Sequence, residues 1–91
     1  MGNVLHFIVL IKLRTKMTKD LIKRVNKIIE TKPAGFTIHS IFWTLGRYDV
    51  VWYVEAPDEK AVMSVTMQFG DSVATETLVA VPREEALKML G

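Results

Sequence analysis

The chain has 91 residues, of which 49% are hydrophobic and 24% charged, and its formal net charge is +2. This length and composition predict one globular domain over residues 1–91 and exclude a disordered chain. The absence of cysteine excludes disulfides, thiolate nucleophiles and cysteine-ligated zinc, and two histidines are a weak basis for a metal site, so we expect no metal and no cofactor.

The apolar segments are too short to cross a membrane. The longest of them, residues 4–11, is interrupted by His6, whereas a spanning helix needs about 20 apolar residues. No basic residue precedes this run, as a signal peptide requires, and His6 stands where a myristoylation signal has Ser or Thr. We therefore expect a soluble, cytoplasmic protein with no membrane partner.

The first two elements are predicted from hydrophobic patterning. Residues 4–13 are rich in Val, Ile, Leu and Phe, which predicts a strand that is buried on both faces. Apolar residues then recur with a helical period over residues 18–32. Thr18 or Thr15 is suited to cap the start of this helix, and Pro33-Ala34-Gly35 ends it.

The predicted helix carries a basic stripe formed by Lys16, Lys19, Lys23 and Lys27. At about 100° per residue these lysines lie within roughly 80° of arc, opposite the apolar stripe. The outer face of an amphipathic helix needs such residues to stay solvated, and the same stripe is suited to bind an anion. Because no helix-turn-helix or assignable aromatic platform accompanies it, we favour a solvated face over a nucleic-acid partner.

The strongest hairpin signal lies between two predicted strands, residues 36–45 and 48–56. Gly46-Arg47 predicts a two-residue turn between them, because glycine readily adopts a positive φ. The resulting register sets three pairs: Trp43 with Val50, Ile41 with Trp52, and His39 with Val54. We expect His39, Tyr48 and Trp52 beneath the helices, and Asp49, Tyr53 and Glu55 on the other face.

The rest of the chain completes a known arrangement. Pro57-Asp58-Glu59 opens a second helix that reaches about Phe69 and is closed by Gly70. Residues 73–81 form a last strand, and residues 83–90 a short helix that packs Ala86, Leu87 and Leu90. This βαββαβ order with a C-terminal helix predicts a ferredoxin-like α+β fold, with a four-stranded antiparallel sheet of order 4-1-3-2 and both long helices on one face. The other face is left uncovered, so we expect a second copy to cover it.

The hairpin region carries a family resemblance. One run resembles the signature of the GYD-domain family: Thr44-Leu45-Gly46-Arg47-Tyr48-Asp49-Val50-Val51, followed by Glu55-Ala56-Pro57-Asp58-Glu59. Residues 74–80 are similar to that family's last strand. The resemblance implies a dimeric α/β barrel, and hence a homodimer or higher homo-oligomer.

Two related groups frame the function that the resemblance implies. The effector-binding domains of leucine-responsive regulators bind small molecules such as amino acids between subunits. Other small barrels of this superfamily are cofactor-free monooxygenases, isomerases or haem proteins. No motif in this chain matches the catalytic residues of those enzymes, so the resemblance implies fold and assembly more than activity.

Asp49, Tyr53, Glu55 and His39 are the candidate ligand-binding residues. Glu55 is suited to acid or base chemistry, or is a solvated or ion-paired residue at the sheet end. Asp49 suits a ligand amine, but a structural role as acceptor for backbone N–H groups near the turn is the commoner one. His39 and His6 lack a third metal ligand, and a strand histidine is more often a packing residue. Trp43 and Trp52 are suited to line a pocket, although core packing is their commoner role.

These observations predict a non-catalytic ligand-sensing or assembly module, with a small organic or amino-acid-like molecule at a subunit interface. The first alternative is a cofactor-free isomerase or monooxygenase acting on a small hydrophobic substrate. In that case Glu55 or a histidine is the base, and Trp43 or Trp52 forms the pocket wall. The second alternative is anion or nucleic-acid binding through the four lysines of the basic stripe.

Overall fold

The computed structural model describes residues 4–91, so the first three residues of the myristoylation-like start lie outside the described part. Its elements in chain order are β1 (Leu5–Leu13), α1 (Lys19–Thr31), η1 (Pro33–Gly35), β2 (Thr37–Trp43), β3 (Val50–Ala56), α2 (Glu59–Thr66), η2 (Met67–Phe69), β4 (Val73–Ala80) and α3 (Arg83–Lys88). The η elements are single 3-10 turns. The chain therefore has the predicted βαββαβ order with a C-terminal helix, and the fold is α+β and ferredoxin-like.

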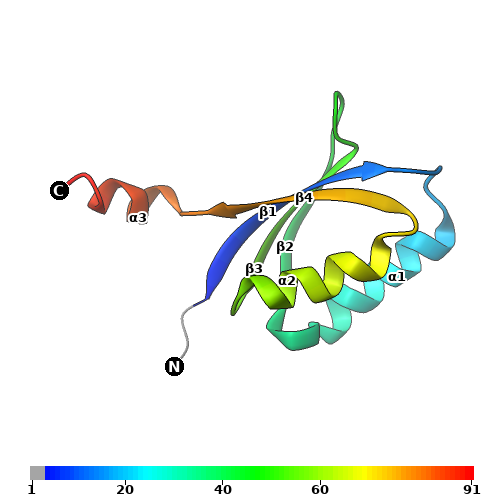
Figure 1. Cartoon of the computed structure of the whole chain (residues 1–91), viewed down its shortest axis with the longest axis horizontal. Coiled ribbons are helices and arrows are strands. Elements are labelled where there is room, and N and C mark those ends of the chain that lie inside the picture. The colour runs from blue at the N-terminus through cyan, green and yellow to red at the C-terminus, as the bar shows by residue number, and fades with distance from the viewer. Residues whose placement is uncertain (1–3) are drawn as a thin grey trace.

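The four strands form one antiparallel sheet in the order β2-β3-β1-β4, as predicted. Helices α1 and α2 lie together on one face of this sheet (Figure 1). We call this side the helical face and the opposite side the open face. Phe7, Val9 and Trp52 are buried on the helical face, whereas β1 residues of the other parity, such as Ile8, are only partly buried. The expectation that β1 is buried on both faces is thus wrong for the single chain, because nothing in residues 4–91 covers the open face.

The helix ends follow the local sequence signals. The Thr18 hydroxyl accepts the backbone N–H of Leu21 at 3.1 Å, which caps α1 as predicted. The Asp58 carboxylate likewise accepts the N–H of Ala61 at 2.9 Å at the start of α2. α1 ends at Thr31 and is capped by Lys32, whose φ of 46° is left-handed, and η1 follows immediately.

The β2–β3 connection is longer than the predicted two-residue turn. The N–H of Thr44 donates to the carbonyl of Asp49 at 2.9 Å, so four residues form the loop. Gly46 has the expected positive φ of 108°. A two-residue and a four-residue loop both place Thr44 opposite Asp49, so the predicted pairs of Trp43 with Val50 and of Ile41 with Trp52 are confirmed.

A β-bulge corrects the predicted position of His39. The register shifts between Ile38 and Ser40, and Val54 pairs with Ile38 rather than with His39. His39 is the extra residue of the bulge, and its imidazole reaches Glu55 instead of the core beneath the helices. Because a bulge breaks the alternation of faces, simple strand parity gave the wrong side for this residue.

Tyr48 also differs from its expected position beneath the helices. Its hydroxyl donates to the carboxylate of Glu76 on β4, whose register partner Leu10 belongs to the open-face set of β1. Tyr48 lies in the loop before β3, where the alternation of strand side chains does not apply.

The C-terminal helix does not pack as predicted. Ala86, Leu87 and Leu90 are all exposed, and β4 carries α3 away from the body of the domain (Figure 1). No helix within residues 4–91 is long and apolar enough to span a membrane.

Candidate functional site

The strand register arranges the open face in rows that run across the sheet. One row holds Phe42, Val51, Leu10 and Glu76, and the next holds Ser40, Tyr53, Ile8 and Leu78. A third row holds Thr37, Glu55, His6 and Ala80, at the end of the sheet where β3 finishes. The open face is therefore mainly apolar across its middle and polar toward its ends, with this row at one end and Lys12 and Asp49 at the other.

Four side chains form a polar cluster at that end: His6, His39, Tyr53 and Glu55. The Tyr53 hydroxyl and Nδ1 of His6 are 2.9 Å apart and share a hydrogen bond. The rings of His39 and Tyr53 stack with centroids 5.1 Å apart, and the His6 and Tyr53 rings lie 5.9 Å apart. The Tyr53 ring is thus in contact with both imidazoles of the chain.

The His39 imidazole and the Glu55 carboxylate form an ion pair when the histidine is protonated. These side chains remain 38% and 26% exposed, so solvent or a ligand can reach both. The cluster offers imidazole, hydroxyl and carboxylate groups, which together can donate and accept hydrogen bonds. Within residues 4–91, no group of three or more His, Cys, Asp or Glu side chains is placed to hold a metal ion.

Asp49 makes its contacts with β1 and not with the four residues of this cluster. Its carboxylate accepts the backbone N–H of Leu13 at 2.8 Å and lies 4.0 Å from the ammonium of Lys12. It also holds β1 through its own N–H, which donates to the carbonyl of Ile11 at 2.8 Å. Asp49 therefore fastens the β2–β3 loop to β1, the structural alternative weighed from the sequence.

Tyr48 and Glu76 make a second polar contact on the open face. The hydrogen bond from the phenol to the Glu76 carboxylate raises the pKa of Tyr48 above its ordinary value of 10.0. Ionising the phenol would remove this bond and place two negative charges together, so the contact favours the neutral form.

The structure brings together three of the four predicted ligand residues: His39, Tyr53 and Glu55. From the sequence, His6 is a candidate only for metal or proton chemistry, and its hydrogen bond to Tyr53 is not predicted. The signal available was the parity of β1, since His6 lies one residue before the buried Phe7 and so faces the other way.

The other candidates lie elsewhere. The four lysines of the basic stripe are all exposed, with Lys16 before α1 and the others along it. Trp52 is buried on the helical face, and Trp43 shares that face because it pairs with Val50. Glu55 and both histidines, the bases named in the first alternative, therefore lie on the side of the sheet opposite the two tryptophans named as its pocket wall.

A family model described as the GYD domain matches residues 7–90. The chain belongs to the GYD domain family. The match begins within β1, continues through α3, and includes three of the four cluster residues, with His6 just before it. Neither the curated proteins nor the solved structures that were compared with the chain give a match. In this GYD domain, Asp49 of the signature run contacts β1 through its carboxylate, which assigns it a role in holding the hairpin.

Proposed function

We propose that this GYD domain is a non-catalytic, homo-oligomeric module that binds a small amino-acid-like molecule where two copies meet over the open face. The observation that carries the proposal is the polar cluster, which lies beside an uncovered apolar sheet surface. A second copy on that surface would shield the cluster from water on one side and leave its hydrogen-bonding groups for a ligand.

The apolar rows support the assembly. Phe42 is 60% and Leu78 45% exposed in the single chain, and Ile8, Leu10 and Val51 lie between them in the register. Contiguous apolar surface of this kind is unfavourable in water and is commonly buried against a partner. A second copy is the simplest partner, because its own open face exposes the same apolar surface and would be buried in the same contact.

The chemistry of the cluster supports an amino-acid-like ligand. The Glu55 carboxylate suits an ammonium group, whereas a protonated His39 or His6 suits a carboxylate. The hydroxyl of Tyr53 shares one hydrogen bond with Nδ1 of His6 and retains capacity for a second hydrogen bond to a ligand. These groups bind both ends of a zwitterion without any step of bond making.

Native mass spectrometry on the freshly purified chain tests assembly and ligand together. We expect a dimer or higher oligomer that carries additional mass corresponding to a bound molecule of amino-acid size. If the protein remains a monomer at protein concentrations well above those found in cells, the proposed assembly is wrong. An oligomer whose melting temperature does not respond to any of the twenty standard amino acids would contradict the ligand class.

Leu78 and Val79 provide a matched pair for the interface. They are neighbours on β4, with Leu78 on the open face opposite Ile8 and Val79 on the helical face opposite Phe7. We expect Leu78→Glu to give a monomer, because it places like charges in the apolar interface, whereas Val79→Glu keeps the oligomer. Equal behaviour of the two variants would show that the open face is not the interface.

A further inference from the structure

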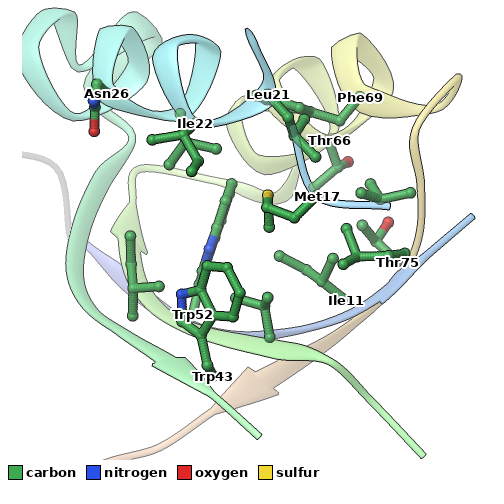
Figure 2. A pocket seen from close by; sticks show the side chains of 15 residues that line it. Ile11, Met17, Leu21, Ile22, Asn26, Trp43, Trp52, Thr66, Phe69 and Thr75 are labelled. Carbon is green, nitrogen blue, oxygen red and sulfur yellow. The ribbon is translucent and has the colours of Figure 1, made fainter. Parts of the chain in front are cut away.

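The helical face contains a pocket of about 230 Å³ between α1 and the sheet (Figure 2). Trp52, Ile11 and Val50 line it from the sheet, and Leu21 and Val25 line it from α1. Exposed residues at its edge, among them Ile22, Asn26 and Trp43, indicate that it opens to solvent between α1 and β2. It is on the opposite side of the sheet from the polar cluster.

The lining determines which kind of molecule fits. None of the fifteen side chains that line this pocket in the described part of the chain is charged, and its polar groups are those of Asn26, Thr66 and Thr75 together with the tryptophan N–H groups. A charged ligand would lose its hydration there without gaining an opposite charge, so the lining selects against ions. The rings of Trp43, Trp52 and Phe69 offer aromatic surface to a flat apolar molecule.

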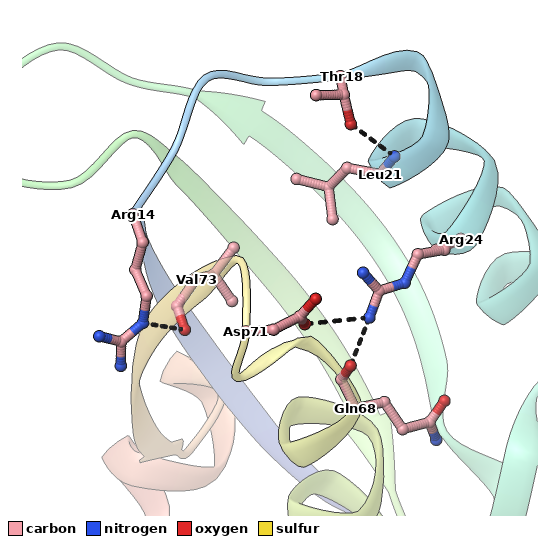
Figure 3. A network of polar contacts seen from close by, with 7 residues as sticks. All are labelled: Arg14, Thr18, Leu21, Arg24, Gln68, Asp71 and Val73. Atoms are coloured by element: carbon pink, nitrogen blue, oxygen red, sulfur yellow. Dashed lines mark hydrogen bonds and ion pairs between the residues drawn. The ribbon is translucent and has the colours of Figure 1, made fainter.

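Polar contacts outside the pocket fix one of its walls. The Arg24 guanidinium on α1 donates to the carbonyl of Gln68 and lies 3.4 Å from the Asp71 carboxylate (Figure 3). The same guanidinium carbon lies 4.8 Å from the centroid of the Phe69 ring. At the start of β4, the carbonyl of Val73 accepts a hydrogen bond from Nε of Arg14 at 3.2 Å. Since Phe69 and Val73 both line the pocket, these bonds hold α1, η2 and β4 at fixed positions around it.

We infer that this pocket is a binding site for a neutral aromatic molecule of one or two rings. The size follows from comparison with an apolar cavity of about 150 Å³, which is large enough for benzene. The pocket of this chain is larger by a margin that admits a second fused ring. The inference is independent of the proposed interface ligand, which is polar and would bind on the other face.

Indole is a suitable probe, and the two tryptophans of the chain are suitable reporters. Both Trp43 and Trp52 line the pocket, and each gives one side-chain N–H signal in a ¹H–¹⁵N spectrum. We expect indole to shift both signals in a saturable way. Indole-3-acetate should bind at least about tenfold more weakly, because its carboxylate has no charged partner in the lining.

Thr75 and Thr77 provide the matched variants. Both are exposed on β4 and face the helical side, opposite Ile11 and Val9, but only Thr75 lines the pocket. We expect Thr75→Phe to weaken indole binding by about tenfold or more by filling the space, and Thr77→Phe to leave it unchanged. If Thr75→Phe fails to fold, Ile22→Trp with Ile29→Trp as its control makes the same comparison on α1.

Three results would overturn the inference. The first is an absence of saturable shifts at the two tryptophans. The second is equal binding by Thr75→Phe and Thr77→Phe. The third is tryptophan shifts that depend on protein concentration without indole, which would mean that a second copy fills the pocket. The Leu78→Glu variant tests the two proposals separately. If it is monomeric and still binds indole, the pocket does not depend on the proposed interface.

Discussion

The hydrogen bond between Tyr53 and His6 runs diagonally across the β1–β3 pairing. Tyr53 has Ile8 as its register partner and His6 has Glu55, yet the Tyr53 hydroxyl lies 2.9 Å from Nδ1 of His6. The diagonal brings His6 into the group that His39 and Glu55 form on the other side of the tyrosine ring. One tyrosine therefore links both histidines of the chain.

Tyr53→Phe should separate the ligand role of this residue from its packing role. The variant keeps the ring between the two imidazoles but loses the hydroxyl, so we expect a stability loss of only about 0.5–1.5 kcal/mol in urea unfolding. We expect the oligomer to persist in native mass spectra, but without the additional mass. Tyr48→Phe is the control, since its hydroxyl contacts Glu76 at another part of the open face. Retention of the small molecule by Tyr53→Phe would contradict our assignment of the site.

Asp49 variants test the structural role of the family signature. Asp49→Ala should destabilise the domain by about 1–3 kcal/mol, because the backbone N–H of Leu13 loses its acceptor. Asp49→Asn keeps an acceptor oxygen and should cost less, by urea unfolding of both variants. A ligand role would give the opposite pattern, with stability unchanged and binding lost in Asp49→Asn.

Much of the fold follows from local patterns that tertiary contacts do not override. The caps at Thr18 and Asp58, the glycine at position 46 and the alternating burial of β3 each have a direct physical cause in the sequence. The order of elements then leaves few ways to close the sheet. This is why topology and most of the hairpin register were predictable.

The site was less predictable because it depends on irregularities. The bulge at His39 has no clear local signal, yet it moves the imidazole from the expected helical face to Glu55. The helix at residues 83–88 has an apolar set typical of packing, but α3 lies away from the body of the domain and is exposed (Figure 1). Both the bulge and the position of α3 depend on contacts between elements, which the pattern of residues within one element does not determine.

The end of α1 offers a stabilising substitution. Lys32 has a φ of 46°, a left-handed conformation that costs a residue with a side chain about 1 kcal/mol relative to glycine. We expect Lys32→Gly to raise the melting temperature by about 4 °C, the usual shift for about 1 kcal/mol in a domain of this size.

Lys27→Gly is the control for that substitution. Lys27 lies inside α1, where glycine costs about 1 kcal/mol relative to a good helix former, so its melting temperature should fall. A decrease in both variants would indicate that the Lys32 side chain makes a contribution larger than the strain it causes.

The Arg24–Asp71 contact predicts a defined dependence of stability on pH. The hydrogen bond from Arg24 lowers the pKa of Asp71 below its ordinary value of 3.8, because it favours the carboxylate. A carboxyl group whose pKa is lower in the folded state stabilises the fold above its unfolded pKa. That contribution is lost as the pH falls through the folded pKa. We therefore expect Asp71→Asn to lower the melting temperature slightly at neutral pH and to match the wild type once the pH falls below the folded pKa of Asp71.

A double-mutant cycle identifies Arg24 as the cause. In an Arg24→Gln background, Asp71→Asn should have a smaller effect at neutral pH, since the main charge partner is already absent. Arg24→Gln should also weaken indole binding, because the same guanidinium lies over the Phe69 ring that lines the pocket. Asp71→Asn leaves that ring contact in place and should affect indole less. If both single variants lose indole binding equally, the Arg24–Asp71 ion pair, rather than the Arg24–Phe69 contact, positions the pocket wall. If indole affinity is unchanged in both variants, the pocket keeps its shape without either contact.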